Sequence, residues 1–476
     1  MRKAVHLLAT IVACIAALAG CATRPVNPPI TKVDPDAGYR FTTRLKYFRD
    51  HDTLLILAFS GGGTRAAAFS YGVLETLRDT ALAGPAGTRG RMLDSVNIIT
   101  GVSGGSFTAL AYGLYGDRLF DRYEHDFLKR DVEGALLARL VDPLNWGDLW
   151  WVPGWGRSEL AARYYDEILF HGATFADLQR GDGPLIVITA TDISTGVRVP
   201  FQQPFFDVLC SDLSAVPLAR AAASSSAVPV VLSPVTYDNH GGTCGYKPPA
   251  WIANLVDPGK PNRSLERAQR QLAELESYGD AGRRPYFHVV DGGVADNLGL
   301  RGVLDVLEVL EAEYAAGRPT PLSRVRRIAI FVVNSLSQPP THWDVSPDAP
   351  GMLPVLLQAA GLPIDHYSFE AIELLRDTAA RWTLLRNLRA SPAFDAARDP
   401  ALARMIATPQ VDLYIIGVSF DALDDKAEAA YLNSLPTSFV LPAEAVDRLR
   451  AAARTVMVSS PEFRRLVRDA GGGSAP

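Results

Sequence analysis

Several short, fully apolar segments of this chain end in glycine-containing turns, and most of these turns lead into helix-like patterns. The clearest unit is residues 53–79, where "TLLILAF" is followed by the triple glycine of "SGGGTR" and by an alanine-rich stretch. A continuous apolar run indicates a strand that is buried on both faces. Related strand patterns recur at residues 95–116, 184–196, 286–310 and 326–335. This alternation predicts an α/β fold, a mixed and mostly parallel sheet flanked by helices.

These units delimit a core at residues 51–337, and the remaining regions are organised differently. Residues 117–175 interrupt the alternation with charged helical patterns and a tryptophan-rich segment, which predicts an inserted, lid-like segment. After residue 337 the pattern is mainly helical, with one clear strand, "VDLYIIGVSF", at residues 411–420. We expect residues 338–476 to form a helical extension whose one strand joins the sheet and whose "GGGSAP" tail is disordered.

The N-terminus has the pattern of an export signal. Residues 1–20 contain two basic residues and then the apolar run Val5–Leu18, which is too short to span a bilayer comfortably. The run ends in "LAGC", which resembles the bacterial lipoprotein box, in which a cysteine, here Cys21, receives lipid. Ala22 after it favours the outer membrane in the sorting pattern of such proteins. Residues 21–50 are rich in proline and predict a flexible tether. A plain secreted protein with a chance Cys21 is the alternative.

The chain has four cysteines, and the export signal limits their roles. Cys14 would be removed with the signal, and Cys21 would carry lipid. Cys210 and Cys244 would then remain in an oxidising compartment, where we expect them to form a disulfide. Two unpaired small core residues are the alternative, because sequence separation alone does not fix the geometry of a bridge.

The overall composition excludes one class of partner. The 476 residues are 48% hydrophobic and 21% charged, which is typical of a folded globular protein. The formal net charge is −5, and no block is rich in Lys and Arg. We therefore expect no nucleic-acid partner.

The first glycine turn, Gly61–Gly63, lies between a buried strand and the start of a helix. Backbone N–H groups of glycines at a helix N-terminus suit the stabilisation of a developing oxyanion. The spacing Gly61-x-Gly63-x-x-Ala66 also fits a dinucleotide fingerprint, but no matching acidic residue ends a second strand. A tight turn with a purely structural role is the third interpretation.

Two further turns carry side chains suited to chemistry. Ser103 lies in Gly101-Val102-Ser103-Gly104-Gly105, a G-x-S-x-G pattern that is typical of a nucleophile elbow, although a chance match in a glycine turn is the alternative. Asp291 follows the apolar "YFHVV" and precedes two glycines, which alone is also a common Asp-Gly turn. Because ligands of open α/β sheets bind where strand ends meet helix starts, we expect the three turns to converge.

The motifs "SGGGTR", "GVSGG" and "DGG", in this order and on these elements, resemble those of the patatin-like phospholipases. The resemblance covers about residues 51–337 and includes "AAASSSAVPVVLSPV", which is similar to a small-residue segment of that family. It implies a catalytic dyad without histidine, in which Ser103 is the nucleophile and Asp291 the base. It implies an oxyanion hole built from Gly61, Gly62 and Gly63, with Arg65 as an additional candidate. It implies no metal and no cofactor.

The resemblance also implies a lipid acyl hydrolase that cleaves carboxylic esters of membrane lipids through an acyl-enzyme. A carboxylate is a weaker base than imidazole, so burial that raises the pKa of Asp291 toward neutrality would help. One alternative is a Ser-His-Asp carboxylesterase that uses His342 or His366, the histidines that follow Asp291. Another is a non-catalytic surface lipoprotein that uses the fold as a binding module.

Four of the seven tryptophans lie within Asn145–Trp155, namely Trp146, Trp150, Trp151 and Trp155. Burial in the core is one explanation, because tryptophans are usually well packed. The glycine and proline between them indicate instead an irregular surface loop, and exposed tryptophans prefer the membrane interface. The second explanation predicts that Trp150 and Trp151 contact the bilayer beside Ser103.

Overall fold

The computed structural model describes most of the chain between Arg24 and Gly471. The described residues are 24–48, 52–83, 89–146, 152, 154–248, 265–315, 317–318, 320, 322–337, 343–345, 347, 349–392, 394–395 and 398–471. The expected export signal, Cys21, Trp150, Trp151, His342 and the C-terminal tail lie outside them.

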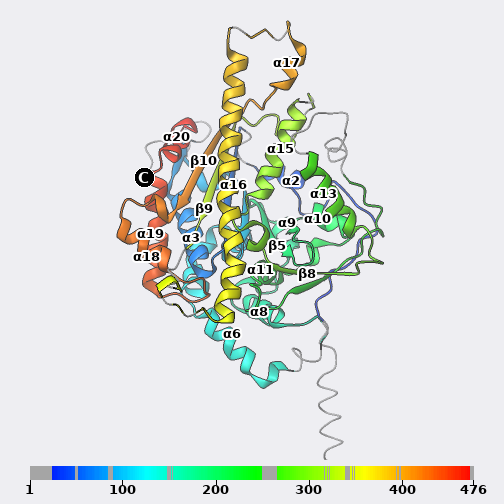
Figure 1. The fold of residues 1–476 in the computed structure, drawn as a ribbon, viewed down its shortest axis with the longest axis vertical. Coiled ribbons are helices and arrows are strands. Elements are labelled where there is room, and N and C mark those ends of the chain that lie inside the picture. The colour runs from blue at the N-terminus through cyan, green and yellow to red at the C-terminus, as the bar shows by residue number, and fades with distance from the viewer. Residues whose placement is uncertain are drawn as a thin grey trace, which may run out of the picture.

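An eight-stranded sheet organises the described chain (Figure 1). Its strand order is β10-β9-β1-β4-β5-β8-β7, with β6 paired to β5. The strands from β10 to β5 in this order run parallel, whereas β8, β7 and β6 join through antiparallel pairs. The prediction of a mixed, mostly parallel sheet is confirmed. The strands are β1 (Thr53–Phe59), β4 (Val96–Val102), β5 (Leu185–Asp192), β6 (Arg198–Pro200), β7 (Val235–Asp238), β8 (Tyr286–Asp291), β9 (Arg327–Asn334) and β10 (Asp412–Ser419).

The apolar content of each strand matches its place in the sheet. Every residue of β1, β4 and β5 is buried, which is why these segments are mostly apolar. The edge strand β10 instead alternates buried and more exposed residues. It pairs in parallel with β9, so the C-terminal extension contributes a strand to the sheet. A separate antiparallel pair joins β2 (Ala81–Ala83) and β3 (Arg89–Arg91).

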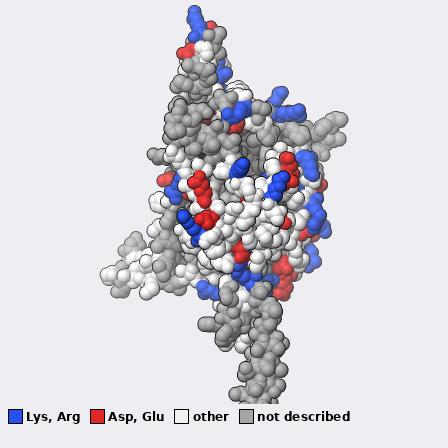
Figure 2. Space-filling model, turned by 90° about the vertical axis from the view of Figure 1, so that its right-hand side faces the viewer, with Lys and Arg blue, Asp and Glu red and all other residues white. Residues whose placement is uncertain are grey.

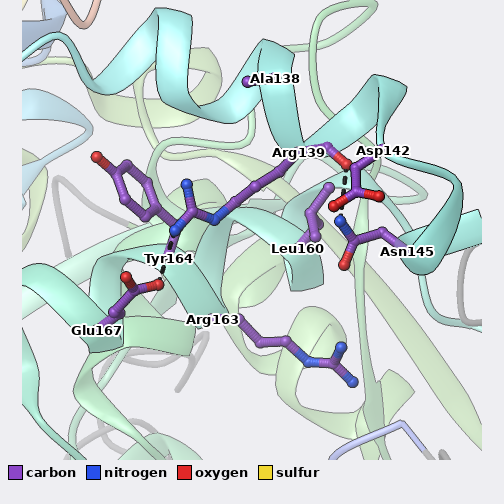
Figure 3. A pocket seen from close by; sticks show the side chains of 8 residues that line it. All are labelled: Ala138, Arg139, Asp142, Asn145, Leu160, Arg163, Tyr164 and Glu167. Atoms are coloured by element: carbon purple, nitrogen blue, oxygen red, sulfur yellow. Dashed lines mark hydrogen bonds and ion pairs between the residues drawn. The ribbon is translucent and has the colours of Figure 1, made fainter.

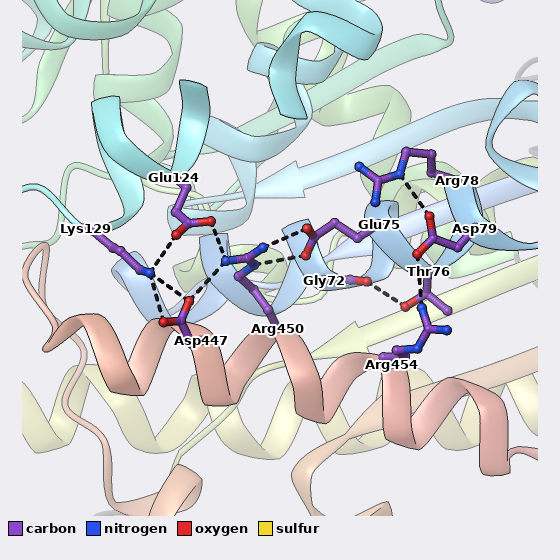
Figure 4. Close-up of polar contacts among 10 residues, drawn as sticks. All are labelled: Gly72, Glu75, Thr76, Arg78, Asp79, Glu124, Lys129, Asp447, Arg450 and Arg454. Carbon is purple, nitrogen blue, oxygen red and sulfur yellow. Dashed lines mark hydrogen bonds and ion pairs between the residues drawn. The ribbon is translucent and has the colours of Figure 1, made fainter. Parts of the chain in front are cut away.

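Helix α3 (Gly63–Asp79) packs against the C-terminal helix α19 (Ala443–Ser459). The two backbones approach closely, because a Cβ at Gly72 would lie 2.6 Å from the carbonyl oxygen of Arg450. The guanidinium of Arg450 binds Glu75 on α3 through two hydrogen bonds of 3.0 and 2.8 Å. The surrounding network in Figure 4 also includes Asp79, Glu124, Lys129, Asp447 and Arg454. These contacts fix the C-terminal extension on the first helix of the core.

The other helices and helical turns connect the strands in chain order. Before β1 lie α2 (Phe41–Arg44) and η1 (Leu45–Tyr47), and between β3 and β5 lie η3 (Met92–Ser95), α4 (Gly104–Tyr115), η4 (Gly116–Arg118), α5 (Leu119–Tyr123), η5 (Glu124–Leu128), α6 (Val132–Val141), η6 (Pro143–Asn145), α8 (Arg157–Tyr165), η7 (Asp166–Phe170) and α9 (Phe175–Arg180). Between β6 and β9 lie α10 (Gln203–Val208), η8 (Leu213–Ala215), α11 (Leu218–Ser225), α13 (Leu265–Tyr278), α14 (Gly293–Asp296) and α15 (Arg301–Ala315). After β9 lie η9 (Trp343–Val345), α16 (Met352–Ala390), α17 (Pro400–Met405), η10 (Phe420–Ala422), α18 (Lys426–Ser434) and α20 (Pro461–Asp469).

Residues 117–175 differ from the lid-like segment that the sequence predicts. Much of this segment belongs to the core, since Phe127, Tyr165 and Phe170 pack around Phe107 of α4. Among its described residues, the outer side of α6 and most of η6 are exposed. The sequence pattern shows the charged residues of this segment, but it does not show that the aromatic residues between them are buried and form a second layer over α4.

Residues 24–48 are packed against the core, so this part of the expected tether is not free. Arg24 forms an ion pair with Asp238, and Pro29 forms a β-bridge with Ser211. Arg44 is buried and donates from Nη1 to the carbonyl oxygens of Leu178 in α9 and Gly181 after it. A proline-rich composition therefore indicates an extended chain here, and side-chain contacts hold it in place.

The expected disulfide is present. Cys210 and Cys244 are bonded with a Cα–Cα distance of 5.4 Å, and the loop that they close contains α11 and β7. Among the described helices, none combines the length and the hydropathy needed to cross a membrane.

Candidate active site

Ser103 lies at the apex of a sharp turn between β4 and α4. Its backbone has φ 47° and ψ −120°, a strained conformation that is typical of a nucleophile elbow. The first glycine loop lies directly against this turn. A Cβ at Gly104 would lie 2.0 Å from the carbonyl oxygen of Gly63, and a Cβ at Gly105 would lie 2.6 Å from that of Ser60. Only glycines allow the elbow and the loop to approach this closely.

Asp291, the last residue of β8, accepts a hydrogen bond from the Ser103 hydroxyl. The distance from Oγ of Ser103 to Oδ2 of Asp291 is 2.8 Å. The strand register explains the meeting, because Val102 pairs with Thr189 of β5 and Asp291 pairs with Ala190, the next residue on that strand. The two side chains thus flank β5 at the same height, although β8 runs opposite to β4. The structure brings together the two residues proposed as the dyad.

The environment of Asp291 favours a proton acceptor with a pKa near neutrality. The residue is only 7% exposed. Burial raises the pKa of Asp291 to about 6, although hydrogen bonds from the Gly293 backbone N–H and the Ser103 hydroxyl lower it. The Gly293 N–H donates to Oδ1 at 2.8 Å, which leaves Oδ2 directed at Ser103. The carboxylate is therefore both oriented and made more basic than an exposed aspartate.

No histidine among the described residues hydrogen-bonds to Ser103 or Asp291. His366 is an exposed residue of α16. The direct contact between the hydroxyl and the carboxylate leaves no position for an imidazole between them. Within the described chain, the geometry therefore favours a two-residue site over a Ser-His-Asp arrangement that uses His366.

The predicted oxyanion donors are not equivalent. The Gly61 N–H donates to the carbonyl oxygen of Asn297 at 3.0 Å, so it is already engaged. Gly62 and Gly63 have φ of 134° and 59°, values that favour glycine, and lie at the N-terminus of α3. Their N–H groups have no hydrogen-bond partner within the described residues. Gly62 and Gly63 are therefore the loop donors best suited to an oxyanion, and Gly61 anchors the loop.

Arg65 has a different role from the oxyanion donor suggested by the sequence. It is buried, and its Nε donates to the carbonyl oxygen of Ser335 at 2.7 Å. Its Nη1 donates to the carbonyl oxygen of Leu435 at 2.7 Å, and its Nη2 donates to Oγ1 of Thr437 at 3.0 Å. The guanidinium therefore joins the loop to β9 and to the C-terminal extension, and it positions the loop from behind.

The segment Leu435–Phe439 packs against the glycine loop. It follows the three motifs in the sequence. The Thr64 N–H donates to the carbonyl oxygen of Ser438 at 2.9 Å. A Cβ at Gly63 would lie 2.2 Å from that same oxygen. The Phe439 ring packs edge-on against Phe107 with 5.5 Å between ring centroids. The loop thus depends on residues that no motif in the sequence marks as functional.

Two further residues support the site and were missed as individual residues. The Ser225 hydroxyl accepts the Ser103 N–H at 2.9 Å and donates to the carbonyl oxygen of Thr189 at 2.7 Å. Asn297 holds Gly61 through its carbonyl, and its Oδ1 is the atom that a Cβ at Gly61 would meet at 2.4 Å. The small-residue segment around Ser225 was a signal in the sequence, and its role required the structure.

A hollow of about 500 Å³ between α6 and α8 contains neither Ser103 nor Asp291 (Figure 3). Its lining includes two arginines and two acids, so its charge is balanced. Within the described residues, no cluster of His, Cys, Asp and Glu has an arrangement that could hold a metal ion. We therefore place the candidate active site at the three converging turns.

Comparison with protein families decides the classification. The model of the patatin-like phospholipases matches residues 57–304, which are 248 of the 476 residues. The chain belongs to this family. Membership supports lipid acyl hydrolase activity for this patatin-like protein, and the matched region contains Ser103, Asp291 and the glycine loop.

Solved structures of low sequence identity are also similar to this patatin-like chain. Human GIVD cytosolic phospholipase A2 is 13% identical, with a TM-score of 0.44, and the alignment covers 95% of this chain and 69% of that one. VipD from Legionella pneumophila is 10% identical, with a TM-score of 0.25, and coverage is 96% and 77%. No curated protein sequence matches the chain.

Proposed function

We propose that this patatin-like protein hydrolyses carboxylic esters of membrane lipids, as a phospholipase A or lysophospholipase, through a Ser–Asp dyad. The observation that carries the proposal is the direct 2.8 Å hydrogen bond from the Ser103 hydroxyl to the buried Asp291 carboxylate. Its position beside glycine N–H groups supplies the second requirement of acyl transfer, which is a site for the oxyanion.

The first half of the reaction forms an acyl-enzyme. Oγ of Ser103 attacks the ester carbonyl carbon and gives its proton to Oδ2 of Asp291. The negative charge that develops on the carbonyl oxygen is stabilised by the N–H groups of Gly62 and Gly63 and by the N-terminus of α3. The intermediate then collapses, and Asp291 returns the proton to the departing alcohol, which is the lysolipid or the glycerol-containing fragment.

The second half releases the fatty acid. A water molecule gives a proton to Asp291 and attacks the acyl carbonyl carbon, and the same N–H groups hold the second oxyanion. When this intermediate collapses, the proton passes from Asp291 back to Oγ of Ser103. The strained elbow keeps Ser103 in one orientation during both halves, so neither step requires the nucleophile to be repositioned.

We further propose that the protein is exported, lipidated at Cys21 and anchored to the bacterial outer membrane. "LAGC" supports the lipidation, and the bond between Cys210 and Cys244 is consistent with an oxidising compartment. Of the tryptophans proposed for membrane contact, Trp150 and Trp151 lie outside the described residues. Within the described part of that cluster, Trp155 is buried and Trp146 is exposed.

A fluorophosphonate probe and three variants test the dyad. Labelling should occur in the wild type and disappear in Ser103→Ala, and Asp291→Asn should reduce ester hydrolysis by at least about a thousandfold while the protein stays folded. His366→Ala is the control and should keep wild-type activity. A comparable loss in His366→Ala would replace the dyad with a triad, and a native protein that neither labels nor hydrolyses esters would favour the binding-module function.

A further inference from the structure

Four large apolar side chains on α6 and the segment after it face solvent, and we call them the apolar ridge: Leu137, Val141, Leu144 and Trp146. Leu144 is 90% exposed, the highest value among the large apolar side chains described, and Val141 is 70% exposed. Leu137 and Val141 are four residues apart, so they share one side of the helix. All four residues lie within positions 137–146, so the exposed apolar side chains are concentrated in one short segment.

Three polar side chains of the same segment lie on the side that faces α8. Figure 3 shows Arg139, Asp142 and Asn145 lining the hollow beside α8. Arg139 pairs with Glu167 at 2.7 Å, and its guanidinium lies 4.0 Å from the centre of the Tyr164 ring. The inward side of α6 is apolar as well, because Val132 is buried and Ala135 and Leu136 pack against the core, so α6 has a second apolar side that faces outward. An outward apolar side suits an apolar environment.

Contacts connect this region to the start of the described chain. Arg24 touches the segment that follows the ridge, since a Cβ at Gly154 would lie 2.8 Å from its Cδ. Only Ala22 and Thr23 separate Arg24 from Cys21. Even a fully extended chain would place the Cys21 Cα within about 11 Å of the Arg24 Cα. A lipid on Cys21 would therefore hold this side of the protein close to the bilayer.

A second set of contacts connects the same region to the catalytic base. Arg157, the first residue of α8, donates to the carbonyl oxygen of Val230 at 3.1 Å. Val230 and Val231 are exposed, and their loop begins at Ala227, whose carbonyl oxygen accepts the Asp291 N–H at 2.9 Å. The anchor end of the chain, α8 and the loop beside Asp291 are thus mechanically linked.

We propose that the apolar ridge is a bilayer-contact surface that inserts into the lipid and orients the catalytic site toward the membrane. The proposal rests on the proposed function and on lipidation at Cys21. Figure 2 shows Lys and Arg interspersed with Asp and Glu on the face that it draws, with no extended patch of one sign. The four ridge residues are uncharged, so the proposed contact is insertion of apolar side chains rather than charge attraction.

The test uses the full mature chain with Cys21→Ser, so that the acyl anchor does not mask the ridge. Val141→Glu/Leu144→Glu places two charges on the ridge at side chains that make little packing contact. Leu384→Glu is the control for an added charge at an exposed leucine elsewhere, because Leu384 is 68% exposed and belongs to α16. Figure 1 shows that the end of α16 next to α17 lies away from α6. Binding is measured by co-sedimentation with vesicles of phosphatidylethanolamine and phosphatidylglycerol, and activity on a short-chain, water-soluble ester is measured in parallel.

The ridge variant should bind vesicles at least about tenfold more weakly than the parent, which corresponds to about 1.4 kcal/mol, while Leu384→Glu binds like the parent. Both variants should hydrolyse the soluble ester at the parent rate. Equal vesicle binding by ridge variant and parent would overturn the proposal, as would a parent that does not co-sediment. If the parent formed a dimer that the ridge variant lost, while the variant still bound vesicles, the ridge would instead be a contact surface for a second copy of the chain. Failure of the proposed function is distinguishable, because no protein would then hydrolyse the soluble ester, whatever the binding.

Discussion

Asp291→Asn should stabilise the protein at neutral pH although it removes the catalytic base. The amide has the shape of the carboxyl group, so it can accept from the Gly293 N–H and donate to Oγ of Ser103, and both contacts are kept. Burial holds the pKa of Asp291 at about 6, above its ordinary value of 3.8. Above that pH the folded chain must contain a buried carboxylate, whereas the unfolded chain exposes the same group to water.

The magnitude follows from the linkage between protonation and folding. A raised pKa in the folded state means that the contribution of this group to stability is present at low pH and is lost as the pH rises through about 6. Raising the pKa of Asp291 from 3.8 to about 6 corresponds to about 3 kcal/mol, of which about 1 kcal/mol is lost between about pH 5 and about pH 8. Asp291→Asn does not suffer this loss.

The assay is urea unfolding of the wild type, Asp291→Asn and Ser103→Ala at about pH 5 and about pH 8. The free energy of unfolding of Asp291→Asn, relative to the wild type, should increase by about 1 kcal/mol between the two pH values. Ser103→Ala is the control, because it removes the hydroxyl but leaves the carboxyl group to titrate, so its stability should decrease with pH as the wild type's does. A pH-independent difference between Asp291→Asn and the wild type would refute the burial argument.

Three further outcomes follow from the site. Ester hydrolysis, measured as kcat/KM on a soluble substrate, should fall about tenfold per pH unit below about 6 as Asp291 becomes protonated, and a flat profile down to about pH 4 would exclude it as the base. Arg65→Lys should lower kcat by about tenfold or more in steady-state assays, with a smaller change in KM, because one ammonium group cannot bind three acceptors in the guanidinium geometry. An unchanged kcat would show that the contacts of Arg65 with Thr437 and its segment do not position the glycine loop. Replacing Cys210 and Cys244 together by serine should lower the free energy of unfolding by about 3–4 kcal/mol in urea titrations, and alkylation of two thiols in the unreduced wild type would contradict the bridge.

The parts of the site that the sequence predicts are those in which local geometry selects the residue. Gly104 and Gly105 can be predicted because any side chain there would collide with the loop at Gly63 or Ser60, and Ser103 can be predicted because it directly precedes them. The strands can be predicted because burial on both faces makes their sequences mostly apolar, although buried polar residues such as Asn97, Thr191 and Asp192 occur in them.

The parts that the sequence does not predict depend on partners far along the chain. The acceptors of Arg65 lie 270 and 370 residues away, so the basic residue beside the loop was open to interpretation as an oxyanion donor. The N-terminal segment was interpreted as a tether because its prolines dominate the composition. The structure shows instead that the side chains of Tyr39 and Arg44 are buried. Residues 117–175 were interpreted as a lid-like segment because the pattern shows their charged residues. It does not show which aromatic residues pack against Phe107.

The contacts between Leu435–Phe439 and the glycine loop determine when the active site can be completed during production of the chain. The loop is made early in synthesis, but the carbonyls of Leu435 and Ser438 that hold it are made about 370 residues later. Contacts this distant form late, because closing a long loop costs more entropy than closing a short one. A growing or truncated chain that stops before this segment would have the Ser103 hydroxyl and the Asp291 carboxylate without a fixed oxyanion site.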